Sequence, residues 1–510
     1  MLARTVSGGL DGVNGFLVDV EAFLGKGMIG FDIVGLPSVA VKESRDRIRA
    51  AMINTGYDWP MKKLTINLAP ADVKKEGTSL ELSIAVALLA AQNPGEYREL
   101  EQTLLLGELT LHGELAPVRG VLSMVLAARD KGVKAVVLPV HNAKEVQCLN
   151  DVTIYSAATL KQVVEHLTGW TRIQPQAQIS YHTLLETYQP ERDLRHVKGQ
   201  LIARKALEIA AAGGHNLLMV GVPGSGKTML ARCMPGILPP LSYEEALETT
   251  CIHSAAGVLQ QETGLMTCRP FRSPHHNASL PSIIGGGIKA KPGEVSLAHN
   301  GVLFLDELPE YQRQTLEALR QPLEDGFVNV TRISGQAKYQ SRCMLVASMN
   351  PCPCGNHGSK SKPCRCKPGE IKRYLARISG PLLDRIDIQI EMDAVEIDDI
   401  RGNREQEDTG AVQKRVVAAR TLQLERYKDE PFFCNAQMPQ EGIEKYCVME
   451  AAARAMLHSA MEKFHISMRT YSRICKVART IADLSGRETI QPQDIAEAIH
   501  LRNLDGRYWR

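Results

Sequence analysis

The chain has 510 residues, which is enough for about three domains. Its 44% hydrophobic and 23% charged residues are typical of a globular protein, and a net charge of +3 is too small to indicate a partner. The start, MLARTVSGGLDG, lacks the apolar run of a signal peptide. The longest apolar stretch begins at Leu80, contains Glu81 and is shorter than the roughly 20 residues of a membrane span. We therefore expect a cytoplasmic protein with no membrane partner and with reduced cysteines.

Residues 1–168 alternate between helical and strand-like stretches. Helical periodicity occurs at 39–56 and 121–132, β-rich runs occur at 63–70 and 133–139, and 104–115 has the pattern of a hairpin. Each of the two helical stretches ends at a glycine, which suits a helix C-cap. This first part is therefore predicted to be a compact α/β domain.

The remaining chain divides into a linker, a sandwich and a helical region. Residues 169–192 are polar and contain Pro175 and Pro190, so we interpret them as a linker. From 193 to 394 the pattern is β-turn-α with long apolar strands, which favours a parallel sheet covered on both faces, an αβα sandwich. Residues 395–510 have helix spacing throughout and predict a helical lid. The expected fold class is α/β.

The strongest motif is a glycine-rich loop in NLLMVGVPGSGKTML, which matches G-x-x-x-x-G-K-[ST] between an apolar strand and a helix. Glycines allow backbone N–H groups to turn toward phosphate oxygens. Lys227 is expected to neutralise the β- and γ-phosphates of ATP, and the Thr228 hydroxyl is expected to ligate Mg²⁺. The expected nucleotide-binding residues are Gly221, Val222, Pro223, Gly224, Ser225, Gly226, Lys227, Thr228 and Met229.

Two further apolar stretches end in polar residues. GVLFLDE ends in Asp306, expected to hold Mg²⁺ through water, and Glu307, expected to orient the attacking water. CMLVASM is followed by Asn350, expected to hydrogen-bond the γ-phosphate or the water. An acidic turn after a buried strand is common by itself. The presence of Lys227 in the same predicted sheet favours the catalytic interpretation.

Arginines follow these strands in an order typical of ring-forming ATPases. Arg385 in SGPLLDRID is expected to stabilise the transferring phosphoryl group, a contact that often comes from a neighbouring subunit. Arg469 near the start of a lid helix, or Arg473 one turn later, is a second candidate. A single arginine is more often a solvated surface charge, so it is the order of motifs that carries this prediction.

These residues together resemble an AAA+ ATPase. RPFRSPHHNASLPSIIGGG (269–287), PGEVSLAHNGVLFLDELPEY (292–311) and SGPLLDRIDI (379–388) are similar to its magnesium-chelatase-like branch. With a further domain in front, the whole chain resembles the ComM/YifB family. The resemblance implies ATP and Mg²⁺ as cofactors and a homohexameric ring with ATP between subunits. It also implies a DNA helicase that promotes branch migration during natural transformation and recombination.

The family also implies two insertions. One is predicted as a hairpin over 327–345, whose arms flank a short turn at Gly335. In related rings this hairpin points into the pore, where Arg332 and Lys338 are candidate contacts to the phosphates of single-stranded or branched DNA, without base readout. A solvated edge hairpin is the alternative. The other insertion is expected at 269–287, where we assign His275 and His276 a structural or phosphate-network role rather than a metal site.

The first domain is similar to the proteolytic domain of Lon, which uses a serine–lysine dyad. Ser79 falls at the serine position, but the lysine position falls at Leu122, whose aliphatic side chain cannot act as a base. We therefore expect the Lon-like fold without its chemistry, and a helix-start role for Ser79. A relocated base, Lys75 or Lys131, is the disfavoured alternative.

Four clustered cysteines follow Asn350. Cys352, Cys354, Cys364 and Cys366 have the spacing C-x-C-x9-C-x-C within an insert at 351–369, and four thiolates can enclose Zn²⁺. The insert has few large apolar residues, so a structural Zn²⁺ would stabilise it, with His357 as an alternative ligand. Four free thiols are the other possibility. The basic residues Lys360, Lys362 and Arg365 make the insert either a candidate DNA contact or a solvated loop.

Three functions compete for this pattern. An ATP-driven ring motor that moves branched DNA fits it best. A chelatase-type motor subunit that remodels a protein partner is the alternative, and the additional first domain and the basic cysteine insert argue against it. An ATP-dependent protease is the third, and Leu122 argues against it.

Overall fold

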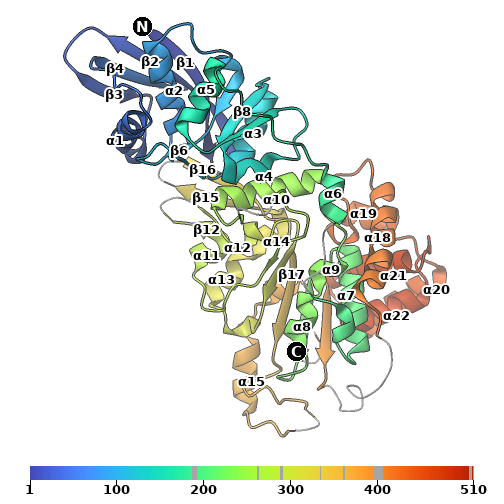
Figure 1. The fold of residues 1–510 in the computed structure, drawn as a ribbon. Coiled ribbons are helices and arrows are strands. Elements are labelled where there is room, and N and C mark those ends of the chain that lie inside the picture. Colours follow the sequence, from blue (N-terminus) through green and yellow to red (C-terminus); the bar gives the residue numbers. More distant parts are fainter. Residues whose placement is uncertain are drawn as a thin grey trace. The chain divides into compact units, whose positions relative to one another are not determined.

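The structure is a computed structural model that describes residues 1–186, 192–260, 264–287, 291–332, 335–359, 362–394, 406–502, 504 and 508. It divides into two compact units (Figure 1). The first comprises Met1–Thr187 and Ser242–Thr267, and the second comprises Tyr188–Leu241 and Cys268–Arg510. The segment Ser242–Thr267 was expected in the sandwich at 193–394, but it lies in the first unit.

The first unit is built on a seven-stranded mixed sheet in the order β3-β4-β2-β1-β5-β8-β9. Its strands are β1 (Leu2–Asp11), β2 (Asn14–Gly25), β3 (Gly30–Val34), β4 (Lys63–Ala69), β5 (Thr103–Leu105), β8 (Ala135–Pro139) and β9 (Thr153–Ala157). The pairs β1–β2 and β2–β4 are antiparallel, whereas β1–β5, β5–β8, β8–β9 and β3–β4 are parallel. The helices are α1 (Val39–Asn54), α2 (Glu81–Gln92), α3 (Val121–Asp130), α4 (Ala143–Val146), α5 (Leu160–Thr168), α6 (Tyr181–Glu186) and α10 (Tyr243–Ala256).

Helix α2 forms the centre of this unit. It is apolar on all sides, and Glu81 to Ala91 are buried, as expected for a helix without a polar face. The buried Glu81 carboxylate accepts from the Arg47 guanidinium and from Leu109 N, at 2.9 Å from the latter. The long apolar run is thus a core helix, as its interrupting charge suggested. Among the described helices, none has the length and apolarity needed to cross a lipid bilayer.

The hairpin expected at 104–115 is only partly present. Leu104 and Leu105 lie in β5, between β1 and β8 of the main sheet. Both side chains are fully buried, as expected for a strand of a sheet that is covered on both faces. The antiparallel pairing is limited to β6 (Glu108–Leu109) and β7 (Leu115–Ala116).

The segment Ser242–Thr267 is part of the core of the first unit. Ser254 Oγ in α10 accepts from Gly120 N at 2.9 Å, at the start of α3. Tyr243 OH donates to Cys148 O at 3.3 Å, and an added Cβ at Gly257 would meet the Arg119 guanidinium. Helix α10 is joined in sequence to the sandwich but packs within the first unit.

The second unit contains a five-stranded parallel sheet in the order β11-β14-β17-β10-β18. The strands are β11 (Phe271–Arg272), β14 (Val302–Leu305), β17 (Met344–Met349), β10 (Leu217–Gly221) and β18 (Ile388–Met392). Helices in this part are α7 (Leu201–Gly213), α8 (Lys227–Arg232), α9 (Met234–Ile237), α11 (Leu280–Ile284), α12 (Glu294–Leu297), α13 (Arg313–Ala318), α14 (Arg320–Asp325), α15 (Pro368–Leu375) and α16 (Gly380–Leu383).

A hairpin and a helical region complete this unit. The hairpin consists of β15 (Phe327–Arg332) and β16 (Gly335–Gln340), so it ends earlier than the predicted 345. Met344 and Leu345 belong instead to β17, where every residue is buried in the central sheet. A short pair, β12 (Gly285–Gly286) with β13 (Lys291–Pro292), lies within or just after the second expected insertion.

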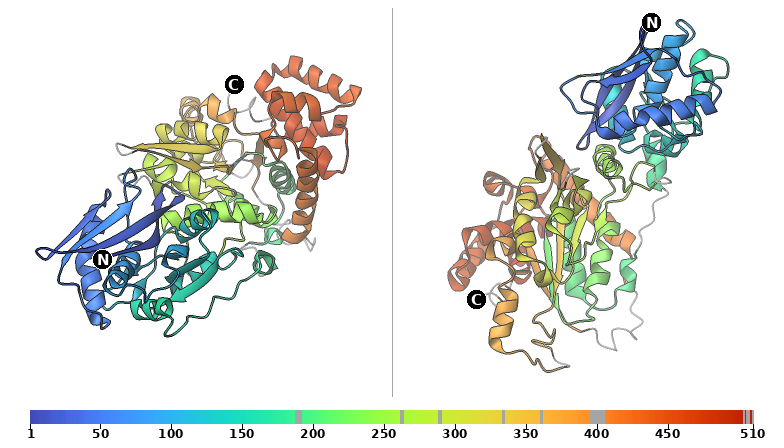
Figure 2. Two further views of the ribbon diagram at one scale, coloured as in Figure 1. Left: turned by 90° about the horizontal axis from the view of Figure 1, so that it is seen from above. Right: turned by 90° about the vertical axis from the view of Figure 1, so that its left-hand side faces the viewer.

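The C-terminal helices are gathered on one side of the second unit (Figure 2). They are α18 (Thr409–Arg426), α19 (Gln440–Tyr446), α20 (Ala451–Phe464), α21 (Met468–Leu484) and α22 (Pro492–His500). Leu207 of α7, Val416 of α18 and Val477 of α21 belong to one buried cluster, so the helices and the sheet share a core.

A buried polar cluster also joins the helices to the sheet. Asp387, just before β18, is 3% exposed. It pairs with Arg473 of α21 and lies 3.3 Å from His215 Nδ1, while His215 Nε2 lies 2.8 Å from Thr480 Oγ1 of α21. Burial raises the pKa of Asp387, but the charge of Arg473 and the hydrogen bond from His215 outweigh it and hold the pKa well below its usual range.

We predict that Asp387→Asn lowers the free energy of unfolding of the second unit by about 3 kcal/mol, because it removes the buried carboxylate that pairs with the partly buried Arg473 and lies beside the buried His215. Thermal unfolding measures this loss. The folded-state pKa lies below the unfolded value of about 3.9, so the stabilisation is complete above that pH and disappears as the pH falls. The difference in the free energy of unfolding between Asp387→Asn and the wild type should therefore become smaller as the pH falls. Asp384→Asn, at a partly exposed pair, is the control and should cost less than about 1 kcal/mol. Equal losses in both variants would contradict the prediction.

Candidate functional site

The glycine-rich loop connects β10 to α8 as the sequence predicted. Gly224 and Gly226 have φ angles of 80° and 89°, a region in which side chains are disfavoured. An added Cβ at Gly221 would come within 2.6 Å of Met392 O, so this position also excludes a side chain. The loop conformation therefore depends on three of its glycines.

Lys227 lies at the start of α8 and points back into its own loop. Its Nζ donates to Gly221 O at 2.7 Å, to Val222 O at 3.0 Å and to Asn350 Oδ1 at 3.3 Å. Burial lowers the pKa of Lys227, and the carboxylates of Asp306 and Glu307 act in the opposite direction. The ammonium group is thus positioned between the loop and the end of β17, where a phosphate could replace the carbonyl oxygens as acceptor.

Asp306 connects the loop to the neighbouring strands. Its Oδ2 accepts from Thr228 Oγ1 at 2.8 Å, and its Oδ1 accepts from Glu307 N at 3.1 Å and from the Ser348 hydroxyl. Sequence reasoning missed Ser348. Ser348 is the polar residue of an otherwise apolar strand and lies two positions before Asn350, so both side chains point to the same face of the sheet. This pattern could have identified Ser348 as a site residue. The Thr228 hydroxyl and the Asp306 carboxylate, at 2.8 Å, are close enough to bind the same Mg²⁺ ion.

Glu307 lies beside the nucleotide loop and contacts a histidine. Its backbone is left-handed, with φ 54°, and its Oε2 is 3.4 Å from His276 Nδ1. The His276 ring lies 4.1 Å from the His275 ring, and Tyr311 OH donates to Pro274 O at 2.6 Å. The two histidines are therefore held next to the carboxylate expected to orient water, a proximity that the sequence pattern did not indicate.

The candidate arginines lie at the other edge of the sheet. Arg385 O accepts from Asn216 Nδ2 at 2.8 Å, and Asn216 lies immediately before β10. The glycine-rich loop begins at Gly221, the last residue of β10. Five strand residues, at about 3.3 Å each, separate these edges by about 16 Å. Arg469 Nη1 lies 3.2 Å from Asp384 Oδ2, and Arg473 pairs with the buried Asp387, so both are also near the amino ends of the strands. Among the described residues, no hydrogen bond joins these arginines to the loop.

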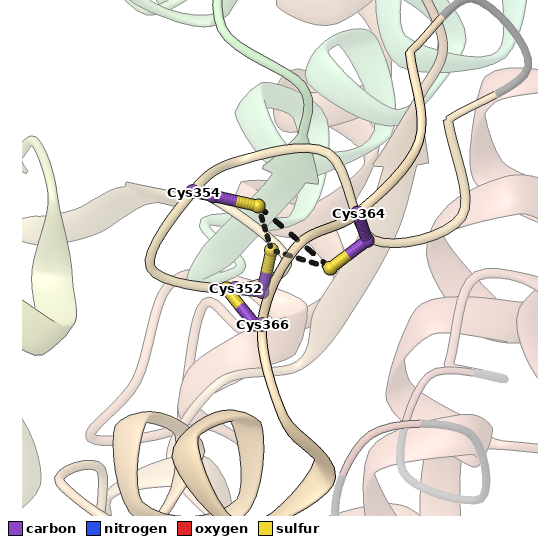
Figure 3. Close-up of side chains that lie close together, drawn as sticks. All are labelled: Cys352, Cys354, Cys364 and Cys366. Carbon is purple, nitrogen blue, oxygen red and sulfur yellow. Dashed lines mark hydrogen bonds between the residues drawn. The ribbon is translucent and has the colours of Figure 1, made fainter.

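The four cysteines come together (Figure 3). Their Sγ atoms lie within 4.8 Å of one another, and Cys352, Cys354 and Cys364 are separated by 3.4 to 3.7 Å. Zn–S bonds of about 2.3 Å place the sulfur atoms of a tetrahedron about 3.8 Å apart, so the donor set fits Zn²⁺. His357 donates its backbone N–H to Cys352 Sγ at 3.3 Å. Backbone N–H groups of Arg365 and Asn356 lower the pKa of the Cys354 thiol, whereas burial raises the pKa of the Cys352 thiol.

The cysteine insert lies against the nucleotide loop. An added Cβ at Gly355 would meet Pro223 Cδ at 2.6 Å and would lie 3.9 Å from Asn350 Cγ. Gly355 has φ 79°, so no other residue is well suited to this position. The insert therefore packs on a residue of the loop and follows directly from Asn350.

The expected DNA contacts are only partly described. The side chain of Arg332 and the whole of Lys360 lie outside the described residues. Lys338 is exposed in the middle of the hairpin rather than at its tip, with Nζ 3.9 Å from the centre of the Phe327 ring. Lys362 and Arg365 are exposed on the cysteine insert.

The Lon-like serine has no base beside it. Ser79 is 5% exposed and donates to Gly8 O at 3.0 Å, so it does not cap α2, contrary to the expected helix-start role. Leu122 is fully buried, and the Lys75 ammonium donates to Pro70 O instead. Lys131 is exposed at the end of α3. Within the described residues, no basic side chain hydrogen-bonds to Ser79.

Comparisons with known proteins identify the family to which the parts of the chain are similar. The family model described as "Magnesium chelatase, subunit ChlI" matches residues 193–400, "Subunit ChlI of Mg-chelatase" matches 20–142, and "Magnesium chelatase, subunit ChlI C-terminal" matches 406–502. The chain is also similar to "Lon protease homolog 2, peroxisomal" of Zea mays. The sequence identity is 30%, and the match covers 29% of this chain and 18% of the relative. The expected Lon-like, AAA+ and helical parts are thereby confirmed.

Several relatives match almost the whole length. "Competence protein ComM" of Haemophilus influenzae is 41% identical over 96% of this chain and 95% of its own. "Uncharacterized protein YifB" of Salmonella typhimurium is 43% identical over 97% of this chain and 96% of its own. This AAA+ family implies ATP and Mg²⁺ as ligands of the site. The chain belongs to the ComM/YifB family of magnesium-chelatase-like AAA+ proteins.

Proposed function

We propose that the chain is an ATP-hydrolysing motor that assembles into a hexameric ring and moves branched DNA as a helicase. The observation that carries the ring mechanism is the separation of Arg385 from the nucleotide loop. Its backbone is bonded to Asn216 at one edge of the sheet, and the loop lies at the opposite edge. Arg385 therefore cannot reach ATP bound to its own protomer, and it acts on ATP bound to the next one.

The loop-side residues have distinct roles in this proposal. Lys227 exchanges its carbonyl acceptors for the β- and γ-phosphates, and the Thr228–Asp306 pair opens to hold Mg²⁺ directly and through water. Bound Mg²⁺ would neutralise charge on the phosphate oxygens. Glu307 orients the attacking water, Asn350 contacts that water or the γ-phosphate, and Ser348 keeps the Asp306 carboxylate in place.

Of the two lid arginines, Arg469 is the better candidate for a contact to ATP. Its side chain is 74% exposed and pairs with a partly exposed aspartate. Arg473 is committed to Asp387, which is buried, so we assign it a structural role. Arg469 and Arg385 lie on the same edge of the sheet and would reach the same neighbouring site.

The proposal of DNA as the substrate rests on basic side chains and on one relative. Lys338 on the hairpin and Lys362 and Arg365 on the cysteine insert are exposed, and such residues bind phosphates without reading bases. We extend the same role to Arg332 and Lys360. A relative named a competence protein supports a role in the uptake or recombination of DNA.

A chelatase-type motor that remodels a protein is the second candidate. It is favoured by the three family models, all of which derive from a magnesium chelatase subunit. A protease is disfavoured because Ser79 is buried and bonded to a backbone carbonyl and Leu122 replaces the base.

We further propose that Cys352, Cys354, Cys364 and Cys366 hold a structural Zn²⁺. Three of the sulfur atoms lie 3.4 to 3.7 Å apart and all four lie within 4.8 Å of one another, and the Gly355–Pro223 contact ties the insert to the loop. A structural ion here would fix the position of the residues that follow Asn350.

The DNA proposal predicts that single-stranded or forked DNA raises ATP turnover several-fold and that salt weakens this effect, because the contacts are to phosphates. Steady-state ATP hydrolysis with and without DNA measures it, and Lys227→Ala is the inactive control. An unfolded protein substrate is tested in parallel for cleavage. Turnover that is insensitive to DNA, together with proteolysis, would contradict the helicase proposal. Insensitivity without proteolysis would favour the chelatase-type motor.

The ring mechanism predicts that Arg385→Ala binds ATP normally but lowers the turnover rate by about a thousandfold or more. Lys227→Ala alone should also be inactive, because it loses nucleotide binding. Mixing the two variants should restore part of the turnover, since some interfaces then join an intact loop to an intact arginine. Mixed assembly is verified by mass. Verified mixed rings with no recovery would place Arg385 in its own protomer's site.

The zinc proposal predicts about one Zn²⁺ per purified chain, which Cys364→Ser should lose. Elemental analysis measures the metal. Cys251→Ser, at a cysteine of the first unit outside the cluster, is the control and should keep it. A fully folded wild type that contains no metal after purification without chelators would refute the site.

A further inference from the structure

Arg385 is held inside its own protomer by two contacts. Its Nη1 donates to Pro381 O at 2.8 Å, and its Nη2 pairs with the carboxylate of Glu324. The side chain of Arg385 is only 16% exposed, whereas that of Glu324 is 63% exposed. In this position the guanidinium has little surface to offer to another molecule.

A carboxylate and a phosphate compete for the same guanidinium N–H groups. The Arg385 backbone is fixed by Asn216, so movement is left to the side chain. Its Nε is buried and, within the described residues, has no hydrogen-bond partner. The retracted position therefore leaves one donor unsatisfied, and an approaching phosphate could satisfy it once Glu324 withdraws.

Glu324 is directly connected to the hairpin. It lies one residue before the end of α14, whose C-cap is Gly326 with φ 72°. Gly326 O accepts from Ser341 N at 2.8 Å, and β15 begins at Phe327. Both arms of the hairpin therefore meet two residues from Glu324, which gives the hairpin a short connection to this carboxylate.

We propose that Glu324 is a positioning residue that holds Arg385 retracted, and that a polynucleotide bound at the hairpin withdraws it and makes Arg385 available to the neighbouring protomer. The inference rests on the proposed function, because it assigns Arg385 to the neighbour's ATP. It adds the step that couples the two sites. The ion pair is exposed on its Glu324 side and is weak enough to open, since exposed pairs shift equilibria by only about two- to fivefold.

The test compares steady-state ATP turnover of the full chain with and without a single-stranded oligonucleotide, in rings whose assembly is checked by mass. Glu324→Gln should raise kcat without DNA about two- to fivefold with KM unchanged, and it should reduce the stimulation by DNA by the same factor. Glu324→Ala should behave in the same way, which guards against an effect of the new side chain. Asp325→Asn removes the same charge one residue along the exposed end of α14, has no ion pair among the described residues, and should behave as wild type.

The double variant Glu324→Gln/Arg385→Ala shows whether the effect passes through the arginine, and it should be as inactive as Arg385→Ala. A kcat of Glu324→Gln at or below that of the wild type would overturn the proposal, as would a raised turnover that persists without Arg385. If DNA does not stimulate the wild type, the proposed action on DNA fails separately. In that case, the DNA-free kcat of Glu324→Gln still decides whether Glu324 retracts Arg385.

Discussion

The common direction of five parallel strands is the constraint on which the site depends. All carboxyl ends meet at one edge, so Gly221, Asp306 and Asn350 come together from segments far apart in the chain. The same rule sends the residues that precede β18, including Arg385, to the opposite edge. A parallel sheet thus separates the groups that hold a phosphate from an arginine that could act on it. In the proposed ring, the arginine of one copy would lie beside the loop of the next.

Short-range patterns could be predicted from the sequence because the physics that produces them is local. The glycine-rich loop needs eight consecutive residues, and its positive φ angles at Gly224 and Gly226 follow from them. The cysteine cluster was likewise visible because its members lie within fifteen residues, Cys352 to Cys366. The resemblance to a known family identified the Lon-like part, which has only weak local signals.

Long-range neighbours could not be predicted in this way. The pairing of His276 with Glu307 and that of Glu324 with Arg385 depend on how loops fold over the sheet edges, which no spacing encodes. The helix-start role expected for Ser79 was wrong, because its hydroxyl found a carbonyl in β1, 71 residues away. The hairpin was predicted too long because only the burial of β17 in the central sheet shows where the second arm ends and the next strand begins.

The insertion of α10 into the first unit has a consequence for biosynthesis. That unit is discontinuous in sequence, because α10 follows the strand β10 and the glycine-rich loop of the second unit. Ser254 of α10 accepts a hydrogen bond from Gly120 N of the first unit. A growing chain emerges from the ribosome in order, and domains generally fold as units during synthesis. The first unit therefore lacks α10 and the acceptor of Gly120 N until β10 and the glycine-rich loop have also been made. The first unit therefore completes its folding only after synthesis of the second unit has begun.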